Sequence, residues 1–325
     1  MRSYCGVYVD AGYLTAAASL RLTGTSYRAA TEMDVASLVT AVVEQVTCHA
    51  DLPLLRVHWY DAARGSASQD QRRIATLPRV KLRLGRTSVH GEQKGVDLKL
   101  ALDLITQARN RVMDVVYLLS GDDDLTEAVE EAQHLGTQVV LLTVPDNEGR
   151  PVNASRNLQM ACDELLLLRA ETLDAHVRRA SPPEPRVEPT PEPTPQTPAE
   201  RPRITPALLA QMTEHRTPAA VPPKRLVVSA SVPVYSSRTG QAHRAETLAD
   251  EDERAVCSVV DSLLTSMSPD TRTRHELVAA KPMIPAELDR TLLLDLSARL
   301  HVDELDVPLR FRLREAFWER LEQPA

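Results

Sequence analysis

Apolar runs alternate with segments of helical periodicity along the first 175 residues of the chain. Short runs rich in Val, Leu and Tyr predict strands at 4–9, 54–60, 80–84, 112–119, 138–144 and 164–168. Helical patterns lie between most of these runs, at 33–47, 70–77, 96–108, 125–135 and 154–161. Strands separated by helices of this length predict βαβ units, and therefore an α/β fold with a mostly parallel sheet covered by helices on both faces.

The strand predicted at 80–84 differs from the others because its polarity alternates. Val80, Leu82 and Leu84 point to one face, whereas Lys81 and Arg83 point to the other. A polar face of this kind is typical of an edge strand. We therefore expect this strand at an edge of the sheet, with a basic exposed side.

The rest of the chain has a different pattern. Thirteen prolines between Ser181 and Pro223 predict a disordered, extended linker at 179–245, which is a spacer or, as the alternative, a ligand for a proline-binding partner. Helical periodicity returns near residue 246 and predicts a small all-α domain at 246–325, with helices at 256–267, 285–300 and 308–321. We expect it to dock a protein partner or to form a homo-oligomer; a helix-turn-helix is the alternative, although no basic recognition face is evident. The N-terminal domain then spans 1–178.

Composition and charge restrict the function. The chain has 325 residues, 43% of them hydrophobic, and a net charge of −7, so it can bury a real core. The segment 56–99 nevertheless holds ten basic residues against four acidic ones. A basic segment in an acidic protein is a candidate contact for a polyanion, and a solvated basic face is the alternative. The acidic C-terminal half is also a candidate inhibitor that folds back onto this segment.

The four cysteines contain no CxxC pair, which fits the reducing cytoplasm better than a disulfide scaffold. Asp10 interrupts the apolar N-terminal run, so the start of the chain does not match the pattern of a signal peptide. No apolar stretch approaches the ~18 residues of a membrane span. We therefore expect a cytoplasmic protein that makes no membrane contact.

Aspartates follow the predicted strands. Asp10 ends the first apolar run, and Asp122, Asp123 and Asp124 follow the fourth, while Asp97 lies in the first turn of the helix predicted at 96–108. In an open parallel sheet the carboxyl ends of the strands form the functional edge, so these side chains are expected to meet there. As the alternative, Asp10 and Asp122 would cap the helices that follow them, and Asp97 would complement a helix dipole.

Clustered carboxylates without Cys or His nearby fit a hard cation, Mg²⁺ or Mn²⁺. Such a cation would relieve the mutual repulsion of the carboxylates and could activate water toward a phosphate ester. Asp103, six positions after Asp97, points to another side of the helix, and we expect it to pair with Lys99 at the surface.

The segments VYVDAGYL, KGVDLKLALDL and VVYLLSGDDDL, in this order and spacing, resemble the NYN domain of the PIN-like nuclease superfamily, and most closely its LabA-like branch. The resemblance covers about residues 4–173. It implies a three-layer α/β/α fold with strand order 3-2-1-4-5 and metal-dependent cleavage of RNA. By position, the family's acidic residues correspond to Asp10, Asp97, Asp122 and Asp124, and Ser120 matches the small polar residue before the acidic pair.

One position departs from this pattern. Many family members carry Asn three residues after the first aspartate, where this chain has Tyr13. Tyr13 could stack on a base or simply pack against the protein.

We therefore expect an endoribonuclease whose catalytic and metal-binding residues are Asp10, Asp97, Asp122 and Asp124. The expected RNA contacts, which would be salt-sensitive and largely sequence-blind, are Tyr13, Arg79, Lys81, Arg83, Arg86, Lys94 and Ser120. For Lys94, a solvent-facing charge is an equal alternative. One alternative function is a non-catalytic RNA-binding adaptor with a degenerate metal site. The other, a phosphatase of small phosphoesters, would be expected to show a DxD motif at the first strand, and Gly12 stands in place of the second aspartate.

Overall fold

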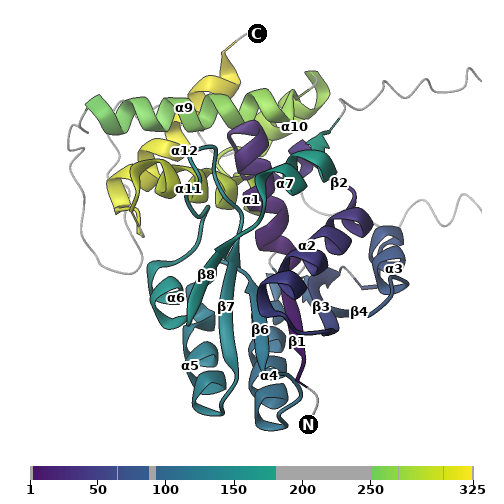
Figure 1. Ribbon diagram of the computed structural model, residues 1–325. Coiled ribbons are helices and arrows are strands. Elements are labelled where there is room, and N and C mark those ends of the chain that lie inside the picture. Colours follow the sequence, from purple (N-terminus) through teal and green to yellow (C-terminus); the bar gives the residue numbers. More distant parts are fainter. Residues whose placement is uncertain are drawn as a thin grey trace, which may run out of the picture. The chain divides into compact units, whose positions relative to one another are not determined.

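A seven-stranded sheet organises the N-terminal part of the protein in the computed structural model (Figure 1). The structure describes residues 3–63, 65–87, 93–180, 250–269, 271–302 and 304–323. The strand order is β5-β4-β3-β1-β6-β7-β8, and the strands are β1 (Cys5–Asp10), β3 (Leu54–Ala63), β4 (Val80–Thr87), β5 (Gln93–Lys94), β6 (Val115–Leu119), β7 (Gln138–Thr143) and β8 (Glu164–Leu167). All neighbours are parallel except β4 and β5. The predicted α/β class is confirmed, and the order 3-2-1-4-5 appears as β4-β3-β1-β6-β7.

Three details of the sheet differ from the sequence pattern. The strand predicted from residue 112 begins at Val115, because Arg111 has a left-handed backbone (φ 49°). The two-residue strand β5 pairs with the end of β4, so among the described strands β4 is an edge only over its beginning. A separate two-stranded sheet joins β2 (Thr31–Met33) to β9 (Val177–Arg179), which the sequence pattern did not predict.

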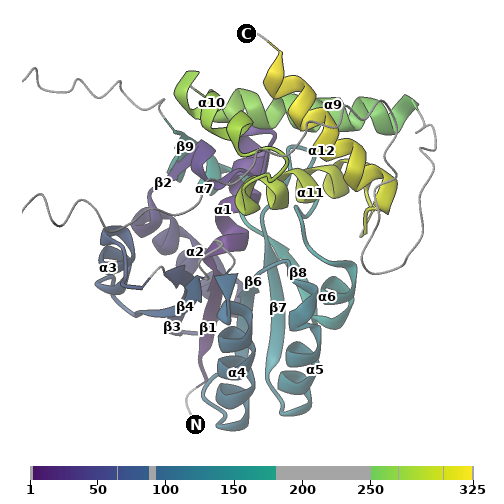
Figure 2. The same ribbon diagram turned by 180° about the vertical axis from the view of Figure 1, so that it is seen from behind.

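Helices cover both faces of the sheet (Figures 1 and 2). One face packs on α1 (Ala11–Thr23), α2 (Val35–Ala50) and α7 (Ala170–His176). The other packs on α4 (Val96–Arg109), α5 (Thr126–His134) and α6 (Arg156–Ala161). The remaining short elements of this part are η1 (Arg28–Ala30), α3 (Gln69–Ala75) and η2 (Asp123–Leu125). The helix α1 begins directly after β1, and η2 begins a few residues after β6.

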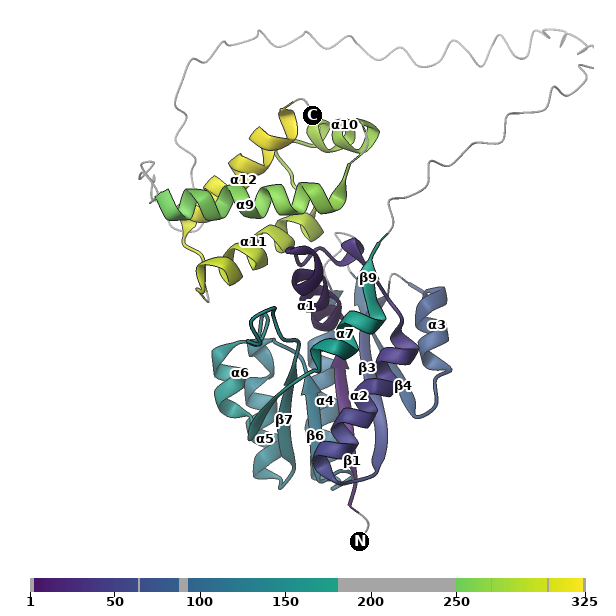
Figure 3. The ribbon, with the colours of Figure 1, turned by 45° about the horizontal axis from the view of Figure 1, so that its top comes forward.

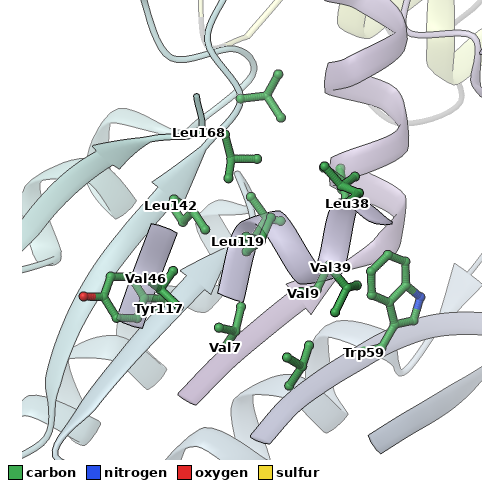
Figure 4. Close-up of a cluster of buried hydrophobic side chains, with 14 of the residues drawn as sticks. Val7, Val9, Leu38, Val39, Val46, Trp59, Tyr117, Leu119, Leu142 and Leu168 are labelled. Carbon is green, nitrogen blue, oxygen red and sulfur yellow. The ribbon is translucent and has the colours of Figure 1, made fainter. Parts of the chain in front are cut away.

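Aliphatic side chains form the core. Figure 4 shows part of the cluster between the sheet and α2, to which β1 contributes Val7 and Val9 and α2 contributes Leu38 and Val46. The one tryptophan of this cluster, Trp59, is only 3% exposed. Burial of each such side chain stabilises the fold by roughly 1.5–3 kcal/mol. The low aromatic content of the chain is therefore offset by many buried Val and Leu side chains.

The C-terminal helices form a cluster of their own. They are α9 (Asp250–Met267), α10 (Thr271–Ala279), α11 (Ala286–Leu300) and α12 (Val307–Glu322). Figure 3 shows α9, α11 and α12 side by side, and their buried residues include Val256, Leu292 and Phe317. The helical C-terminal region is thus confirmed, with a first helix that begins six residues earlier than expected. The described residues of the N-terminal part and of the C-terminal helices belong to one compact unit.

The domain boundaries at 178 and 245 stay predictions, because the predicted linker lies outside the described residues from residue 181 on. Among the helices that the structure describes, none is both long enough and apolar enough to cross a membrane.

His58 is a buried structural residue of β3. Its ring is 4% exposed and stacks on Tyr8, with 4.8 Å between the ring centroids. Burial lowers the pKa of His58 from its ordinary 6.5 to about 4, and the nearby charge of Asp103 only partly opposes this shift. The ring is therefore neutral at neutral pH.

This shift predicts a pH-dependent stability. Between pH 6.5 and about 4 the unfolded His58 binds a proton before the folded one does, so the free energy of unfolding should fall as the pH falls. The loss is on the order of 3 kcal/mol, and denaturant unfolding at a series of pH values would measure it. The variant His58→Phe keeps an aromatic ring beside Tyr8 but does not titrate, so its stability should fall less over this window. Identical pH profiles of the two proteins would contradict the prediction.

Candidate active site

Asp10 closes β1 and starts α1. One carboxylate oxygen, Oδ1, accepts the backbone N–H groups of Gly12 at 2.8 Å and Tyr13 at 3.2 Å, so Asp10 caps the helix as the sequence allowed. The other oxygen, Oδ2, accepts the hydroxyl of Ser120 at 3.4 Å. The side chain is buried, and burial raises its pKa although the N–H donors and the charge of Arg28 oppose this. Hydrogen bonds thus fix the carboxylate of Asp10 in place at the end of the central strand β1.

The loop after β6 carries the second group of acids. Ser120 is buried, and its hydroxyl also accepts the N–H of Asp122 at 3.3 Å. Asp122 caps η2 by accepting the N–H of Asp124 at 3.2 Å. Asp123 turns toward the start of α6, where its carboxylate accepts hydrogen bonds from the side chains of Ser155 and Asn157. The hydrogen bonds of Asp123 therefore lie apart from those of Asp122 and Asp124.

Asp97 lies in the first turn of α4, after Gly95 in a left-handed conformation (φ 76°). It is partly buried, and its pKa is raised to about 6. Burial is the largest cause, followed by the negative charges of Asp10, Asp122 and Asp124. Four carboxylates from three separate segments thus act on one another at the carboxyl edge of β1 and β6, which are adjacent in the sheet.

The residues match the chemistry of a hard cation in kind, because carboxylate oxygens are the donors that Mg²⁺ and Mn²⁺ prefer. Within the described residues, no three Asp, Glu, His or Cys side chains lie close enough together to hold a metal ion as they stand. After burial, the negative charges of Asp10, Asp122 and Asp124 contribute to the raised pKa of Asp97, so these charges disfavour its ionised form. A cation would offset this repulsion, so the donor set fits a metal in the kind of its ligands.

Tyr13 packs against the protein. Its hydroxyl donates to the carbonyl of Val152 at 2.8 Å and accepts the N–H of Val144 at 3.4 Å. Its ring lies beside Gly121, where a Cβ on the glycine would come within 2.7 Å of a ring carbon. Of the two roles that the sequence allowed, these contacts favour packing over base stacking.

The basic residues expected to guide RNA do not all have free side chains. Arg83 donates to both carboxylate oxygens of Asp103, at 2.7 and 2.6 Å, and Tyr60 donates to the same carboxylate at 3.0 Å. Asp103 therefore pairs with Arg83 rather than with Lys99, whose ammonium donates to the carbonyl of Leu84. The expectation of an Asp103–Lys99 pair was wrong, because β4 brings Arg83 over this face of α4.

Two other basic candidates precede Arg83 in the chain, and the remaining two have side chains that the structure does not describe. Lys81 is exposed, two residues before the level of Asp10 in the sheet. Arg79 is exposed just before β4 begins, about 13 Å from the level of Arg83 at 3.3 Å per residue. The structure describes the backbone of Arg86 and Lys94 but not their side chains.

Sequence reasoning missed two charged residues near the acids. Arg28 of η1 approaches the first turn of α1, and its charge interacts with Asp10 and Asp61. Asp61 lies near the carboxyl end of β3, so the strand-end rule could have identified it. No local pattern marks Arg28, because only the chain reversal after α1 brings it back to this edge.

Known proteins that are similar to parts of this chain include one relative and one solved structure. A protein of Sinorhizobium fredii (strain NBRC 101917 / NGR234), described only as the uncharacterized protein y4oD, is 45% identical over 82 residues, which are 25% of this chain and 38% of the length of that relative. A crystal structure of a protein of unknown function from Vibrio parahaemolyticus, VPA0982, is 20% identical and covers 52% of this chain and 95% of its own, with a TM-score of 0.36.

The family comparison is more direct, because a model of the NYN domain matches residues 4–169, about half of the chain. That span begins just before β1 and ends just after β8, so it includes the whole seven-stranded sheet and all four converging aspartates. The chain belongs to the NYN family, a family of PIN-like nuclease domains.

Proposed function

We propose that this protein is a metal-dependent ribonuclease that cleaves phosphodiester bonds of RNA. The observation that carries the proposal is the convergence of Asp10, Asp97, Asp122 and Asp124, because the charges of the other three add to burial in raising the pKa of Asp97. A fold that holds one carboxylate in the field of three others lowers its own stability unless the cluster binds something positive. Membership of a nuclease family makes RNA cleavage the best-supported use of that cluster.

Asp10, Asp97, Asp122 and Asp124 would hold Mg²⁺ or Mn²⁺ in this proposal. When bound, such a cation would help to deprotonate water and offset the negative charge that develops on a phosphate. The protein holds Asp10 by hydrogen bonds to both of its carboxylate oxygens, from the N–H of Gly12 to Oδ1 and from the hydroxyl of Ser120 to Oδ2, whereas Asp124 is exposed. Ser120 therefore acts as a positioning residue for Asp10.

The non-catalytic adaptor is the second candidate function, since Tyr13 departs from the family pattern. In the structure, the hydroxyl of Tyr13 donates a hydrogen bond to the carbonyl of Val152, and all four acidic positions are occupied by aspartate. This combination favours the enzyme over the adaptor. Cytoplasmic localisation, a protein partner for the C-terminal helices and homo-oligomerisation stay predictions from the sequence.

Cleavage of a set of single-stranded and hairpin RNAs by the purified full-length protein tests the proposal. We expect products with Mg²⁺ or Mn²⁺ and none with EDTA, and no turnover of a small phosphoester such as p-nitrophenyl phosphate. RNA binding without products under every metal condition would support the adaptor instead. Turnover of the small phosphoester alone would point to a phosphatase.

Substitution of Lys81 in β4 should mainly weaken RNA binding, whereas substitution of Arg83 in the same strand should mainly lower stability. Lys81→Gln removes an exposed charge and should weaken RNA binding severalfold, with little effect on stability, because phosphate contacts of this kind are electrostatic. Arg83→Gln leaves Asp103 without its bidentate partner and should lower the free energy of unfolding by about 1–3 kcal/mol. Fluorescence anisotropy with labelled RNA and denaturant unfolding would measure the two effects. Equal effects of both substitutions on RNA affinity would contradict this division.

A further inference from the structure

A buried carboxylate anchors the C-terminal helices to the N-terminal part of the protein. Asp295 of α11 is 3% exposed, and it accepts the hydroxyl of Thr25 at 2.7 Å and the N–H of Ser26 at 2.9 Å. The next residue, Tyr27, packs against the hydrophobic cluster of the C-terminal helices. A buried carboxylate is tolerated only when such donors satisfy it, so this contact fixes where α11 meets the loop before η1.

The anchor brings a second arginine toward the acids. Arg290 lies five residues before Asp295 on α11, about 7.5 Å along the helix axis. Its positive charge acts on Asp97, where it opposes the rise in pKa, and on Arg28. Arg290 therefore lies near the carboxyl edge of the sheet, although it is almost 200 residues away from Asp97 in sequence.

Arg28 approaches the same edge from η1, three residues after the anchoring Thr25. Its Nη2 atom lies 2.8 Å from the position that a Cβ on Gly12 would occupy, and Gly12 directly follows the Asp10–Ala11 step at the end of β1. The charges that face Arg28 are those of Asp10, Asp61, Glu287 and Arg290. Two guanidinium groups from distant segments thus stand near each other beside the acidic cluster.

The hydrogen-bonding capacity of both guanidinium groups is unused within the described part of the chain. There, Arg28 and Arg290 interact with the surrounding acids only through their charge, and neither forms an ion pair or a hydrogen bond with them. If Arg290 blocked the cluster in place of a cation, it would lie within ion-pair distance of a carboxylate. Two neighbouring cations with free donors instead fit an anion bound between them, and guanidinium groups are suited to phosphate.

We propose that Arg290 and Arg28 bind a backbone phosphate of the RNA next to the acidic cluster, so that the C-terminal helices complete the nucleic-acid site. This inference rests on the proposed function, since it takes RNA as the ligand. Arg290 then acts in substrate binding, and Asp295 positions it through Thr25 and Ser26.

The test compares full-length Arg290→Gln with full-length Arg299→Gln. Arg299 is an exposed arginine on the same helix, nine residues and two and a half turns away from Arg290. Its substitution therefore removes the same charge from another side of α11. Affinity for a fluorescent single-stranded RNA is measured by anisotropy in EDTA at several salt concentrations, so that binding is read without cleavage. We expect Arg290→Gln to weaken binding about tenfold and to reduce the slope of log K against log salt by about 0.7, whereas Arg299→Gln matches the wild type. Arg290→Lys should recover the salt slope because it restores the charge.

The outcomes separate this inference from the proposed function. Wild-type cleavage together with unchanged affinity and salt slope in Arg290→Gln would overturn the role of Arg290 and leave the ribonuclease intact. Binding without cleavage by the wild type, with weaker binding by Arg290→Gln, would support the role of Arg290 and reject the nuclease. Tighter binding or faster cleavage by Arg290→Gln would overturn the inference in favour of an inhibitory contact. A wild-type protein that does not bind RNA would overturn both.

Discussion

Asp97→Asn is expected to lower the rate of RNA cleavage about 100-fold or more while leaving the folded protein as stable as the wild type, or more stable. The carboxylate of Asp97 has no hydrogen-bonding role among the described residues that Asn would disrupt, and its raised pKa means that its negative charge destabilises the folded state at neutral pH. Removing that charge should stabilise the metal-free protein by about 1–3 kcal/mol. A residue kept for the fold would show the opposite effect on stability.

Thermal unfolding in EDTA and in Mg²⁺ measures this effect independently of cleavage. In EDTA, the Tm of Asp97→Asn should equal or exceed that of the wild type by a few degrees. Addition of Mg²⁺ should raise the Tm of the wild type more than that of the variant, because a ligand that binds the folded state stabilises it.

Asp123→Asn is the matched control, since Asp123 belongs to the same acidic run but faces Ser155 and Asn157. It should retain most of the activity and the full response to Mg²⁺. If Asp97→Asn cleaves RNA at the wild-type rate, Asp97 is not one of the catalytic residues.

Gly121→Ala is expected to lower both stability and activity. A Cβ at this position would lie 2.0 Å from the carbonyl oxygen of Asn153 and 2.7 Å from the ring of Tyr13. The carbonyl belongs to the backbone, and Gly121 is also tied to this region because its own carbonyl accepts the N–H of Ser155 at 3.0 Å. The loop must therefore move as a whole, at a cost of about 1–3 kcal/mol or more, and it carries Asp122 and Asp124 with it.

Gly6→Ala provides a control with the same nominal clash. A Cβ at Gly6 would lie 2.0 Å from the sulfur of Met113, but this contact is made by a flexible side chain that can change rotamer. Denaturant unfolding should show a smaller loss of stability than for Gly121→Ala, and cleavage should be close to that of the wild type. If both variants lose the same stability and Gly121→Ala cleaves normally, the close packing of this loop is not required for activity.

The sequence determined the parts of this protein that depend on local pattern. Apolar runs and helical spacing identified the six main strands and most of the helices, because burial and backbone geometry impose their periods on the residues of each element. The position of Asp10 and Asp122 after apolar runs placed them at strand ends, and the rule that parallel strands share a carboxyl edge then brought them together. The strand order came from the resemblance to the NYN domain, since the pattern alone does not say which strands are neighbours.

Only the tertiary structure decided which charged side chains meet. Arg83 is engaged by Asp103, twenty residues away, although the helical spacing had favoured Lys99 as the partner of Asp103. The anchor from Asp295 to Thr25 joins residues 270 positions apart, and it is this contact that carries Arg290 toward Asp97. Long-range pairs of this kind leave no local pattern, because the sequence around each polar partner does not indicate the distant segment that it contacts. They are selected by the packing of whole elements against one another, so the sequence identified the four aspartates at the strand ends and helix start but neither Arg28 nor Arg290.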